Sequence, residues 1–296
     1  MSRRGWLLFI ALCIVWGIPY MFTRIAVREI APPTLVFLRT LPAALLLIPL
    51  ALHRRELRPL LAHWRWIVVY TAAEIALPWL LLSHAQQRIS SSLAGLLIAS
   101  VPLIAAVLYG KAGGADVYDR RRRAGLIIGF AGVAALVGID VGSSDPLAVA
   151  EVAAVAVLWT TGPFIVSRHL ADLPALGVIT ASLLLNALVY APALFLWPPG
   201  SLSVETVAAV LVLSLVCTAL AFLLFFSLVR EVGPSRTTIV TYVNPLVAVL
   251  LGVVVLSEPF TLGIAVGMPL VLLGSALATA PSRDGTASSP PAPEAE

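Results

Sequence analysis

The feature that most constrains this chain is an internal repeat, in which the second half copies the first at an offset of 143 residues. Pro102 in the segment VPLIAAVL corresponds to Pro245 in NPLVAVLL, and Trp16 corresponds to Trp159. Further matches at the same offset are Ser92 with Ser235, Leu103 with Leu246 and Ala105 with Ala248, and matches shifted by one residue are Asp116 with Glu258, Gly125 and Gly132 with Gly267 and Gly274, and Arg24 with Arg168. Because three separate stretches repeat in one order, the sequence predicts a duplicated fold.

The composition requires this duplicated chain to lie in a lipid bilayer. Of its 296 residues, 60% are hydrophobic and 11% are charged, which is too much apolar surface for a water-soluble globule to bury. The apolar runs are about 17 to 25 residues long, as a helix needs to cross about 30 Å of hydrocarbon. Cys13 and Cys217 both lie inside such runs, so we expect neither a disulfide framework nor a metal site, and no cofactor.

The apolar runs predict an all-α integral membrane protein with ten transmembrane helices. The expected spans are 6–25, 33–52, 66–83, 92–110, 124–140, 147–167, 175–196, 206–229, 237–256 and 262–280. Five spans fall in each copy, which gives a first repeat at 1–142 and a second at 143–280. The Pro-, Ala- and Ser-rich remainder, 281–296, is expected to be a disordered cytoplasmic tail.

The basic residues predict the orientation of the chain. With ten spans, fifteen of the 19 Lys and Arg residues fall on one side of the membrane. They are Arg3, Arg4, Arg54, Arg55, Arg58, Arg65, Lys111, Arg120, Arg121, Arg122, Arg123, Arg168, Arg230, Arg236 and Arg283. By the positive-inside rule, both termini are cytoplasmic. Since each repeat has an odd number of spans, the second repeat enters the membrane inverted relative to the first, as in many transporters.

Two sequence motifs resemble those of a known family. The first span contains the motif W-G-x-P-Y at its centre, and the ninth span and its surroundings read Gly-Pro-Ser, Tyr-x-x-Pro-Leu and Leu-Ser-Glu-Pro up to Pro259. Over nearly the whole chain to about residue 280, the sequence resembles ten-span exporters of the drug/metabolite transporter superfamily, built from two EamA domains. The resemblance implies an inverted-repeat bundle in the inner membrane with a central substrate cavity. It also implies small metabolites, amino acids or toxic compounds as substrates.

Three charged residues are expected inside the membrane: Arg39, Glu74 and Glu151. A charge at that depth is energetically unfavourable, which makes each a candidate for function. Counted at about 1.5 Å per residue, all three lie in the outer half of the bilayer. We expect Arg39 to bind one of the two carboxylates directly, in a cluster that holds a substrate carboxylate or relays a proton. The alternatives are an ion pair that only locks two helices, and a Glu74 that is simply protonated.

Polar aromatic residues and an amide also lie within the expected spans. The candidate substrate-binding residues of this kind are Trp16, Tyr20, Trp79, Trp159, Tyr242 and Asn244. Pro19 and Pro163 lie close to the two repeated tryptophans and are expected to bend the backbone, as in the broken helices where transporters bind substrates. Packing between helices is the alternative role for these side chains.

Pro102 and Pro245 occupy the same place in the two repeats, near the middle of the fourth and ninth spans. We expect them to act as hinges during transport, although membrane helices also tolerate proline without any motion. The fifth and tenth spans carry small residues at short spacings, which favour close packing of these two helices or a dimer contact. These residues are Gly125, Gly129, Gly132, Gly263, Gly267 and Gly274.

These observations favour a secondary transporter, more specifically an exporter of small metabolites or of amino-acid-like or drug-like solutes. Its partners are then a small molecule and the bilayer, and it is a monomer or homodimer. The Arg120–Arg123 run abuts a span, so topology and anionic lipid explain it better than nucleic acid does. No phosphate-binding loop or common hydrolase motif occurs in the sequence, so a membrane enzyme and a non-transporting scaffold are the weaker alternatives.

Overall fold

The structure is a computed structural model that describes residues 1–109, 120–139, 145–233, 237 and 239–279. This described part of the chain contains helices and loops but no strand, so the all-α fold class is confirmed. Asp116, Ser235 and the tail 281–296 lie outside the described residues.

The helices of the first half follow the five expected spans. They are α1 (Arg3–Gly17), α2 (Pro19–Ala26), α3 (Pro32–His53), η1 (Arg58–His63), α4 (Trp64–Thr71), η2 (Ala72–Ala76), α5 (Leu77–Ala85), α6 (Ser91–Ile98), α7 (Val101–Tyr109) and α8 (Arg120–Gly138). Three of these spans are interrupted. The first breaks before Pro19, the third contains the π-helical turn η2, and the fourth breaks between α6 and α7 just before Pro102.

The helices of the second half follow the remaining expected spans. They are α9 (Pro146–Ile165), η4 (Val166–Leu170), α10 (Ala175–Tyr190), α11 (Ala193–Leu196), α12 (Val204–Leu211), η5 (Val212–Leu220), α13 (Ala221–Val232), α15 (Val240–Val255) and α16 (Leu262–Thr279). The segments η4 and η5 are again π-helical. Short π-helical segments inside α-helices occur frequently at functional sites.

Eight continuous helical stretches in the described residues are long and apolar enough to cross a membrane. α15 is apolar but shorter, and α8 begins with four arginines. Side chains at the helix starts explain where several of these stretches begin. Ser90 accepts a hydrogen bond from the backbone of Leu93 at 3.1 Å, and Ser203 does the same for Thr206 at 3.1 Å. Such caps satisfy N–H groups that a helix start leaves without an internal partner.

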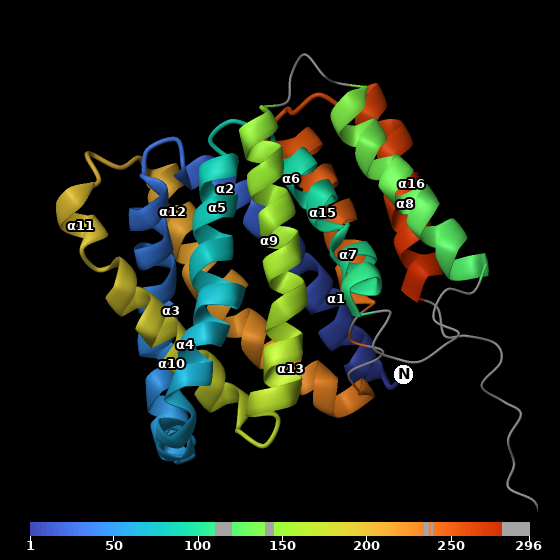
Figure 1. Ribbon diagram of the computed structural model, residues 1–296. Helices are drawn as coiled ribbons and strands as arrows, with labels where there is room; N and C mark the ends of the chain where they lie inside the picture. Colours follow the sequence, from blue (N-terminus) through green and yellow to red (C-terminus); the bar gives the residue numbers. More distant parts are fainter. Residues whose placement is uncertain (110–119, 140–144, 234–236, 238, 280–296) are drawn as a thin grey trace, which may run out of the picture.

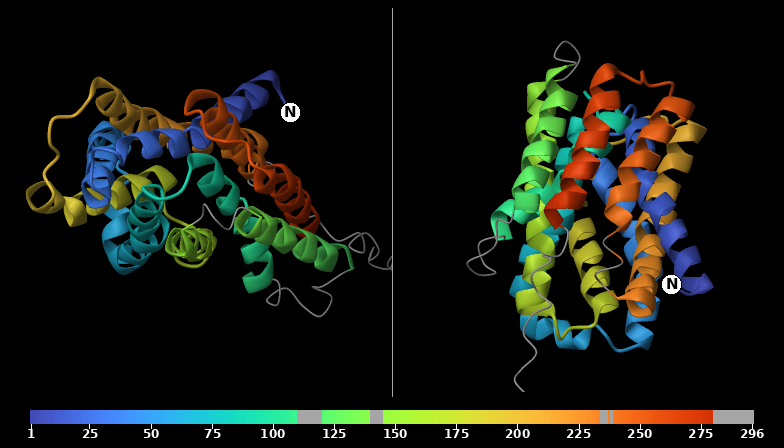
Figure 2. Two further views of the ribbon diagram at one scale, coloured as in Figure 1. Left: turned by 90° about the horizontal axis from the view of Figure 1, so that it is seen from above. Right: turned by 90° about the vertical axis from the view of Figure 1, so that its right-hand side faces the viewer.

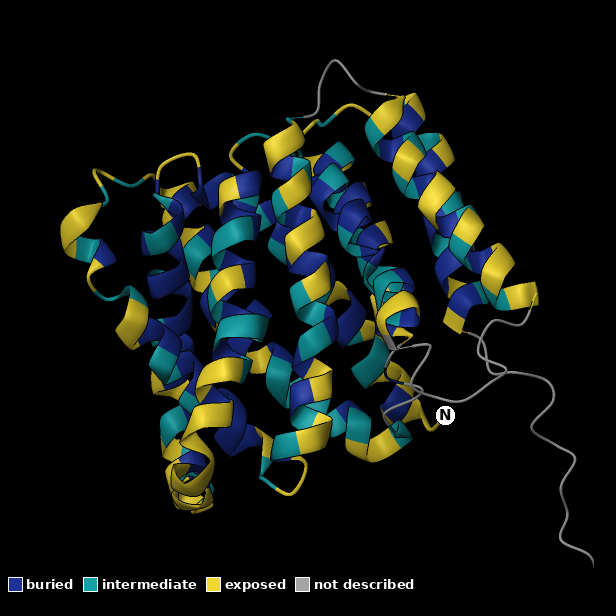
Figure 3. Cartoon of the chain, viewed as in Figure 1, coloured by how far each residue is buried: buried dark blue, intermediate teal, exposed yellow. Residues whose placement is uncertain are grey.

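Helices from the two halves interleave to form the bundle. α3 packs against α10, α5 against α9, α6 against α15, and α1 against both α13 and α15. Figure 1 and the two views of Figure 2 show these helices running roughly side by side, with α8 and α16 together at one edge. Figure 3 shows that buried residues follow the inward faces while exposed residues follow the outer ones. In a bilayer, that apolar outer surface contacts lipid.

The predicted contact between the fifth and tenth spans is confirmed, and glycines make it possible. A Cβ atom on Gly125 would lie 2.5 Å from the backbone nitrogen of Ala278, and one on Gly132 would lie 2.6 Å from that of Val271. Since residue numbers rise along α8 as they fall along α16, the two helices are antiparallel. The small residues let the two backbones approach closely, as in other membrane helix pairs.

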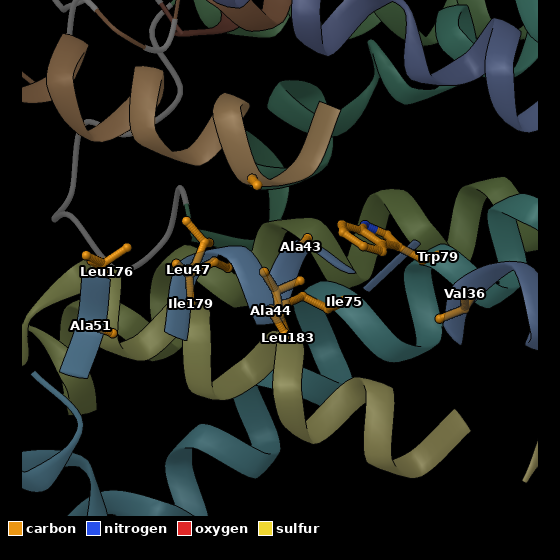
Figure 4. Packing of buried hydrophobic residues seen from close by; sticks show 11 residues of the cluster. Val36, Ala43, Ala44, Leu47, Ala51, Ile75, Trp79, Leu176, Ile179 and Leu183 are labelled. Carbon is orange, nitrogen blue, oxygen red and sulfur yellow. The ribbon is translucent and has the colours of Figure 1, made fainter. Parts of the chain in front are cut away.

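One cluster of buried residues lies where α3, η2, α5, α10 and η5 meet. Figure 4 shows this cluster from nearby, with Trp79 at one end and Leu176 and Ala51 at the other. Its members are Val36, Ala43, Ala44, Leu47, Ala51, Ile75, Trp79, Leu176, Ile179, Leu183 and Ala219. Three of them, Ala43, Ala44 and Ala51, are fully buried alanines on α3, the helix that also carries Arg39.

Candidate functional site

Arg39 is a buried charge whose partners are neutral. It projects from α3 with only 9% of its surface exposed. Its Nε donates a hydrogen bond to the hydroxyl of Thr218, in η5, at 3.2 Å, and its guanidinium carbon lies 3.8 Å from the centre of the Trp79 ring. Stacking on an aromatic face stabilises a cation but does not neutralise it. Arg39, Trp79 and Thr218 therefore form a cationic site between the two halves of the chain.

The expectation that Arg39 binds Glu74 or Glu151 directly is wrong in this structure. Among the described residues, no ion pair joins Arg39 to a carboxylate, and both nearby acids have other environments. The prediction used only depth along the membrane normal. Whether two side chains at equal depth meet also depends on how each helix is rotated, which the packing of the whole bundle decides.

Glu74 lies in the π-helical turn η2, opposite α9. Its backbone carbonyl accepts a hydrogen bond from the indole nitrogen of Trp159 at 3.0 Å. Its carboxylate oxygen Oε2 is buried and has no hydrogen-bond partner within the described chain. That oxygen lies so close to Gly162 that a Cβ atom there would collide with it. Glycine at this position is what makes room for the carboxylate, and Trp159 fixes the turn that carries it.

Trp159 connects these groups to the centre of the bundle. It packs against the cluster that contains Trp79 and also against a second cluster that contains Tyr20. Tyr20 is buried, and its backbone carbonyl accepts a hydrogen bond from the amide of Gln86 at 2.8 Å. The structure thus brings five of the nine predicted binding residues into one central region: Tyr20, Arg39, Glu74, Trp79 and Trp159.

Glu151 belongs to a separate ionic network near the start of α9. Its two carboxylate oxygens contact His84 Nδ1 at 2.6 Å and an Arg88 nitrogen at 2.5 Å. Arg88 also pairs with Asp145, the N-cap of α9, at 3.3 Å. Hydrogen bonds from the backbone N–H of Ala148 and Leu147, together with Arg88, hold the pKa of Asp145 below its usual value. This network ties the end of α5 to the start of α9.

The remaining predicted binding residues make contacts between helices. Trp16 packs on Phe222 and Phe225 of α13, with ring centres 6.4 and 5.1 Å away. The hydroxyl of Tyr242 is hydrogen-bonded to that of Thr279 in α16 at 2.5 Å. The amide of Asn244, oriented so that its nitrogen faces carbonyl oxygens, donates to Val240 at 3.0 Å and to Cys13 at 3.2 Å.

The four prolines predicted as hinges have different local structures. Pro19 and Pro102 each lie just after a break between two helices, and Pro163 lies inside α9, close to the π-helical turn η4. Pro245, by contrast, lies inside an uninterrupted α15. The repeat equivalence of Pro102 and Pro245 is therefore not matched by equal helix geometry.

The most heavily hydrogen-bonded carboxylate that we find in the described chain is one that the site prediction missed. Glu258, in the loop before α16, accepts four hydrogen bonds at the start of α6. Its Oε1 accepts from the backbone nitrogen of Ser91 at 2.7 Å and from the Ser91 hydroxyl at 2.9 Å, and its Oε2 accepts from those of Ser92 at 2.9 and 2.5 Å. A Cβ atom on Gly252 would collide with this arrangement. We call this contact the Glu258 clamp.

One sequence signal pointed towards the clamp. Ser92 lies in the repeated stretch, and Leu-Ser-Glu-Pro ends the second copy of it. A paired serine at a helix start is a typical anion-binding arrangement, because its N–H groups and hydroxyls converge. What the sequence did not indicate is that the anion comes from the other half of the chain.

A bundle of membrane-length helices with buried charges between its two halves is a polytopic membrane protein of the transporter type. The model of the EamA-like transporter family matches the sequence twice, over residues 3–138 and 147–280. The chain belongs to this family. Family membership favours a transporter over the membrane enzyme and the scaffold.

Individual relatives agree with this assignment. An uncharacterized transporter of Bacillus subtilis, YvbV, is 24% identical over 95% of this chain and 93% of its own length. The uncharacterized inner membrane transporter YedA of Escherichia coli is 28% identical over 82% of this chain and 79% of its own. A solved crystal structure, 22% identical, matches the fold with a TM-score of 0.67 over 94% of this chain and 97% of its own.

Proposed function

We propose that the protein is a secondary transporter that binds a small solute with a carboxylate group, such as an amino-acid-like metabolite, at Arg39. The observation that carries this proposal is the buried guanidinium of Arg39, which has an aromatic and a hydroxyl partner but no carboxylate partner within the described residues. A buried charge without a counterion is unfavourable. The carboxylate of a substrate is the counterion that would complete the site.

The neighbouring aromatic side chains are suited to the rest of such a solute. Trp79 lies under the guanidinium, and Trp159 links the clusters around Trp79 and Tyr20. Binding sites for small molecules are mostly apolar, with a few polar groups that fix orientation. In our proposal the substrate carboxylate meets Arg39, and its side chain contacts these rings. Trp16, Tyr242 and Asn244 then support the bundle around the site.

Glu74 is the proposed proton carrier. Its Oε2 is buried and has no hydrogen-bond partner among the described residues, so no protein group there occupies the position where a proton would bind. Ionisable groups within membrane spans frequently serve as proton relays. Coupling of substrate movement to protons through Glu74 is therefore the mechanism that we propose, with Glu151 engaged in its ionic network on one side of the bundle.

Alternating access between two inverted five-span repeats is the proposed mechanism of movement. The antiparallel contact of α8 with α16 supports an inverted relation, and the double match of the family model supports the duplication. The contacts between helices also support the inverted relation. In the two repeats, α1 corresponds to α9 and α6 corresponds to α15. The contact of α1 with α15 therefore has a counterpart in the contact of α9 with α6. With α8 and α15 counted as spans, ten helices result. The proposed domains are 1–142 and 143–280.

In this mechanism the helices change direction at the breaks before Pro19 and Pro102 and at Pro163, next to the π-helical turn η4. Pro245 is the fourth proposed hinge. The count of basic residues supports cytoplasmic termini, and export is the direction that we propose. Transport in either direction uses the same site.

Transport by proteoliposomes tests the proposed site. The purified protein is reconstituted and screened for uptake of radiolabelled amino acids and their carboxamide analogues, with and without a pH gradient. Replacing Arg39 with glutamine should lower uptake of carboxylate substrates about tenfold or more, because a hydrogen bond to a charged group contributes about 1.5–3 kcal/mol. Arg28, which is exposed outside the membrane core, provides the matched control in an Arg28→Gln variant.

Equal uptake by the Arg39→Gln protein and the control, at equal expression, would remove Arg39 from the mechanism. Equal transport of the acids and their carboxamides would overturn the carboxylate substrate while leaving a transporter. A pH-independent rate that is also unchanged in a Glu74→Gln protein would exclude Glu74 as the proton carrier.

A further inference from the structure

An apolar groove lies outside the central region, between the end of α3, the turn η1, α4 and the middle of α10. Its volume is about 360 Å³, at the lower end of the range for ligand sites. The residues that line it are Ile48, Leu57, Leu60, Leu61, Trp64, Ile67, Val68, Thr180, Ala181, Leu184 and Leu185. The groove lies on the side of the bundle away from α8 and α16 (Figure 1).

The chemistry of this lining suits a hydrocarbon chain. Thr180 is the one lining residue with a hydroxyl, and that hydroxyl already donates to the backbone carbonyl of Leu176 at 2.7 Å. At the edge of the groove, Leu61 and Trp64 are 76% and 58% exposed. Like the rest of the apolar outer surface, these two side chains contact lipid in a bilayer. Trp64 also marks a depth near the lipid headgroups, where tryptophan is enriched.

The same end of the bundle carries a group of positive charges. Arg54, Arg55, Arg58 and Arg65 are all exposed, and they come from the segment that forms the floor and edge of the groove. Among the described residues, none of the four forms an ion pair with a carboxylate. The acidic residue within this segment is Glu56. Its carboxylate accepts a hydrogen bond from the backbone N–H of Gly177 at 3.0 Å and forms no ion pair with these arginines. Arg65 lies over the Trp64 ring, 5.6 Å from its centre.

We propose that this groove is a binding site for an anionic phospholipid. One acyl chain lies against the apolar lining, and the phosphate group meets the arginines at the edge. Charge complementarity identifies the occupant: a neutral lipid would leave the arginine group without an anion. A basic pocket at the headgroup level between membrane helices is a recognised form of lipid site. The site does not rest on the proposed transport function, because none of Tyr20, Arg39, Glu74, Trp79 and Trp159 lines it, although Leu57 and Leu184 also pack against the cluster that contains Trp79.

Native mass spectrometry of the full-length protein in detergent tests this proposal. The protein is titrated separately with phosphatidylglycerol and with phosphatidylcholine of the same acyl chains. Phosphatidylglycerol should bind in preference. The double variant Arg54→Gln, Arg58→Gln should weaken its binding roughly thirtyfold, given the usual attraction of two arginines to an anionic lipid surface.

A second variant tests the groove itself. Ala181→Phe fills the lining and should abolish retention of phosphatidylglycerol, whereas Val189→Phe, on an exposed part of the same helix, should not. Arg3→Gln with Arg4→Gln, exposed at the start of α1, is the matched charge control. Equal binding of the two lipids overturns the choice of an anionic occupant. Unchanged phosphatidylglycerol binding in both the Ala181→Phe and the arginine variants overturns the site.

Discussion

Replacing Glu258 with glutamine tests whether the Glu258 clamp holds the two halves of the chain together. In the native protein, Oε1 accepts from the N–H and hydroxyl of Ser91 and Oε2 accepts from those of Ser92. Glutamine keeps one oxygen and therefore the bonds to Ser91. Its amide nitrogen, however, would face the backbone N–H of Ser92, so two donors meet. The Ser92 hydroxyl can rotate to accept a hydrogen bond, but the N–H cannot.

The expected loss in the free energy of unfolding comes mainly from the Ser92 N–H, which loses its hydrogen-bond partner. Leaving a buried N–H without a partner costs about 1–3 kcal/mol, and removing a negative charge from a helix start costs about 0.3–1 kcal/mol. The sum is about 2 kcal/mol. For a chain of this size, about 1 kcal/mol corresponds to roughly 2 °C in Tm, so Glu258→Gln should lower Tm by about 4 °C. Glu258→Ala leaves the backbone N–H groups of both Ser91 and Ser92 without a partner and should lower Tm by about twice as much.

Thermal unfolding in detergent, followed by tryptophan fluorescence, measures this effect. The control is Glu205→Gln, because Glu205 lies in the first turn of α12 and is exposed, so only its interaction with the helix dipole is lost. Its Tm should fall by less than about 2 °C. Equal shifts for Glu258→Gln and Glu205→Gln would refute the reasoning, because the four hydrogen bonds would then contribute nothing beyond a charge at a helix start.

Two further predictions follow from close contacts. Gly162→Ala forces a methyl group onto the carboxylate of Glu74 and should lower the free energy of unfolding by about 1–3 kcal/mol, measured as a lower Tm. The control is Gly138→Ala. A Cβ atom at Gly138 has no neighbouring atom within 4 Å, so its Tm should stay unchanged or rise. The pKa of Asp145 is held below its usual value, chiefly by the N–H of Ala148. Ionised Asp145 therefore stabilises the folded protein fully at pH values above the usual aspartate pKa, and this contribution is lost as the pH falls through the lowered pKa of the folded state. In the Asp145→Asn protein, Tm measured over that acidic range should lose this part of its pH dependence, and an unchanged pH profile would count against the assignment.

The sequence predicted the helices with good accuracy because each one satisfies a local requirement. A run of about 20 apolar residues is stable as a helix in lipid whatever its neighbours are. The spans expected at 33–52 and 175–196 are found as α3 (Pro32–His53) and as α10 with α11 (Ala175–Leu196). The helix interruption just before Pro19 has a similarly local cause, since proline removes a backbone hydrogen bond wherever it occurs.

The contact between helices that the sequence indicated is the one where small residues occur on both helices, with a dimer contact as the alternative. The glycines of α8 and α16 indicated their own contact, because close approach requires small side chains on both helices. Charged residues gave no such indication. Arg39 and Glu151 lie at similar expected depths, yet Glu151 pairs with Arg88 and His84, while Arg39 lies on Trp79.

The sequence by itself determined the environment of this protein, its helical content, its duplication and the identity of its buried charges. These properties depend on transfer of side chains into lipid and on backbone hydrogen bonding, both of which act on each segment separately. Only the tertiary structure decided that Arg39 meets an aromatic ring, that Glu74 lies against Gly162 and that Glu258 reaches the start of α6. Those contacts depend on the rotation of each helix about its axis, which is fixed by the packing of all the others together.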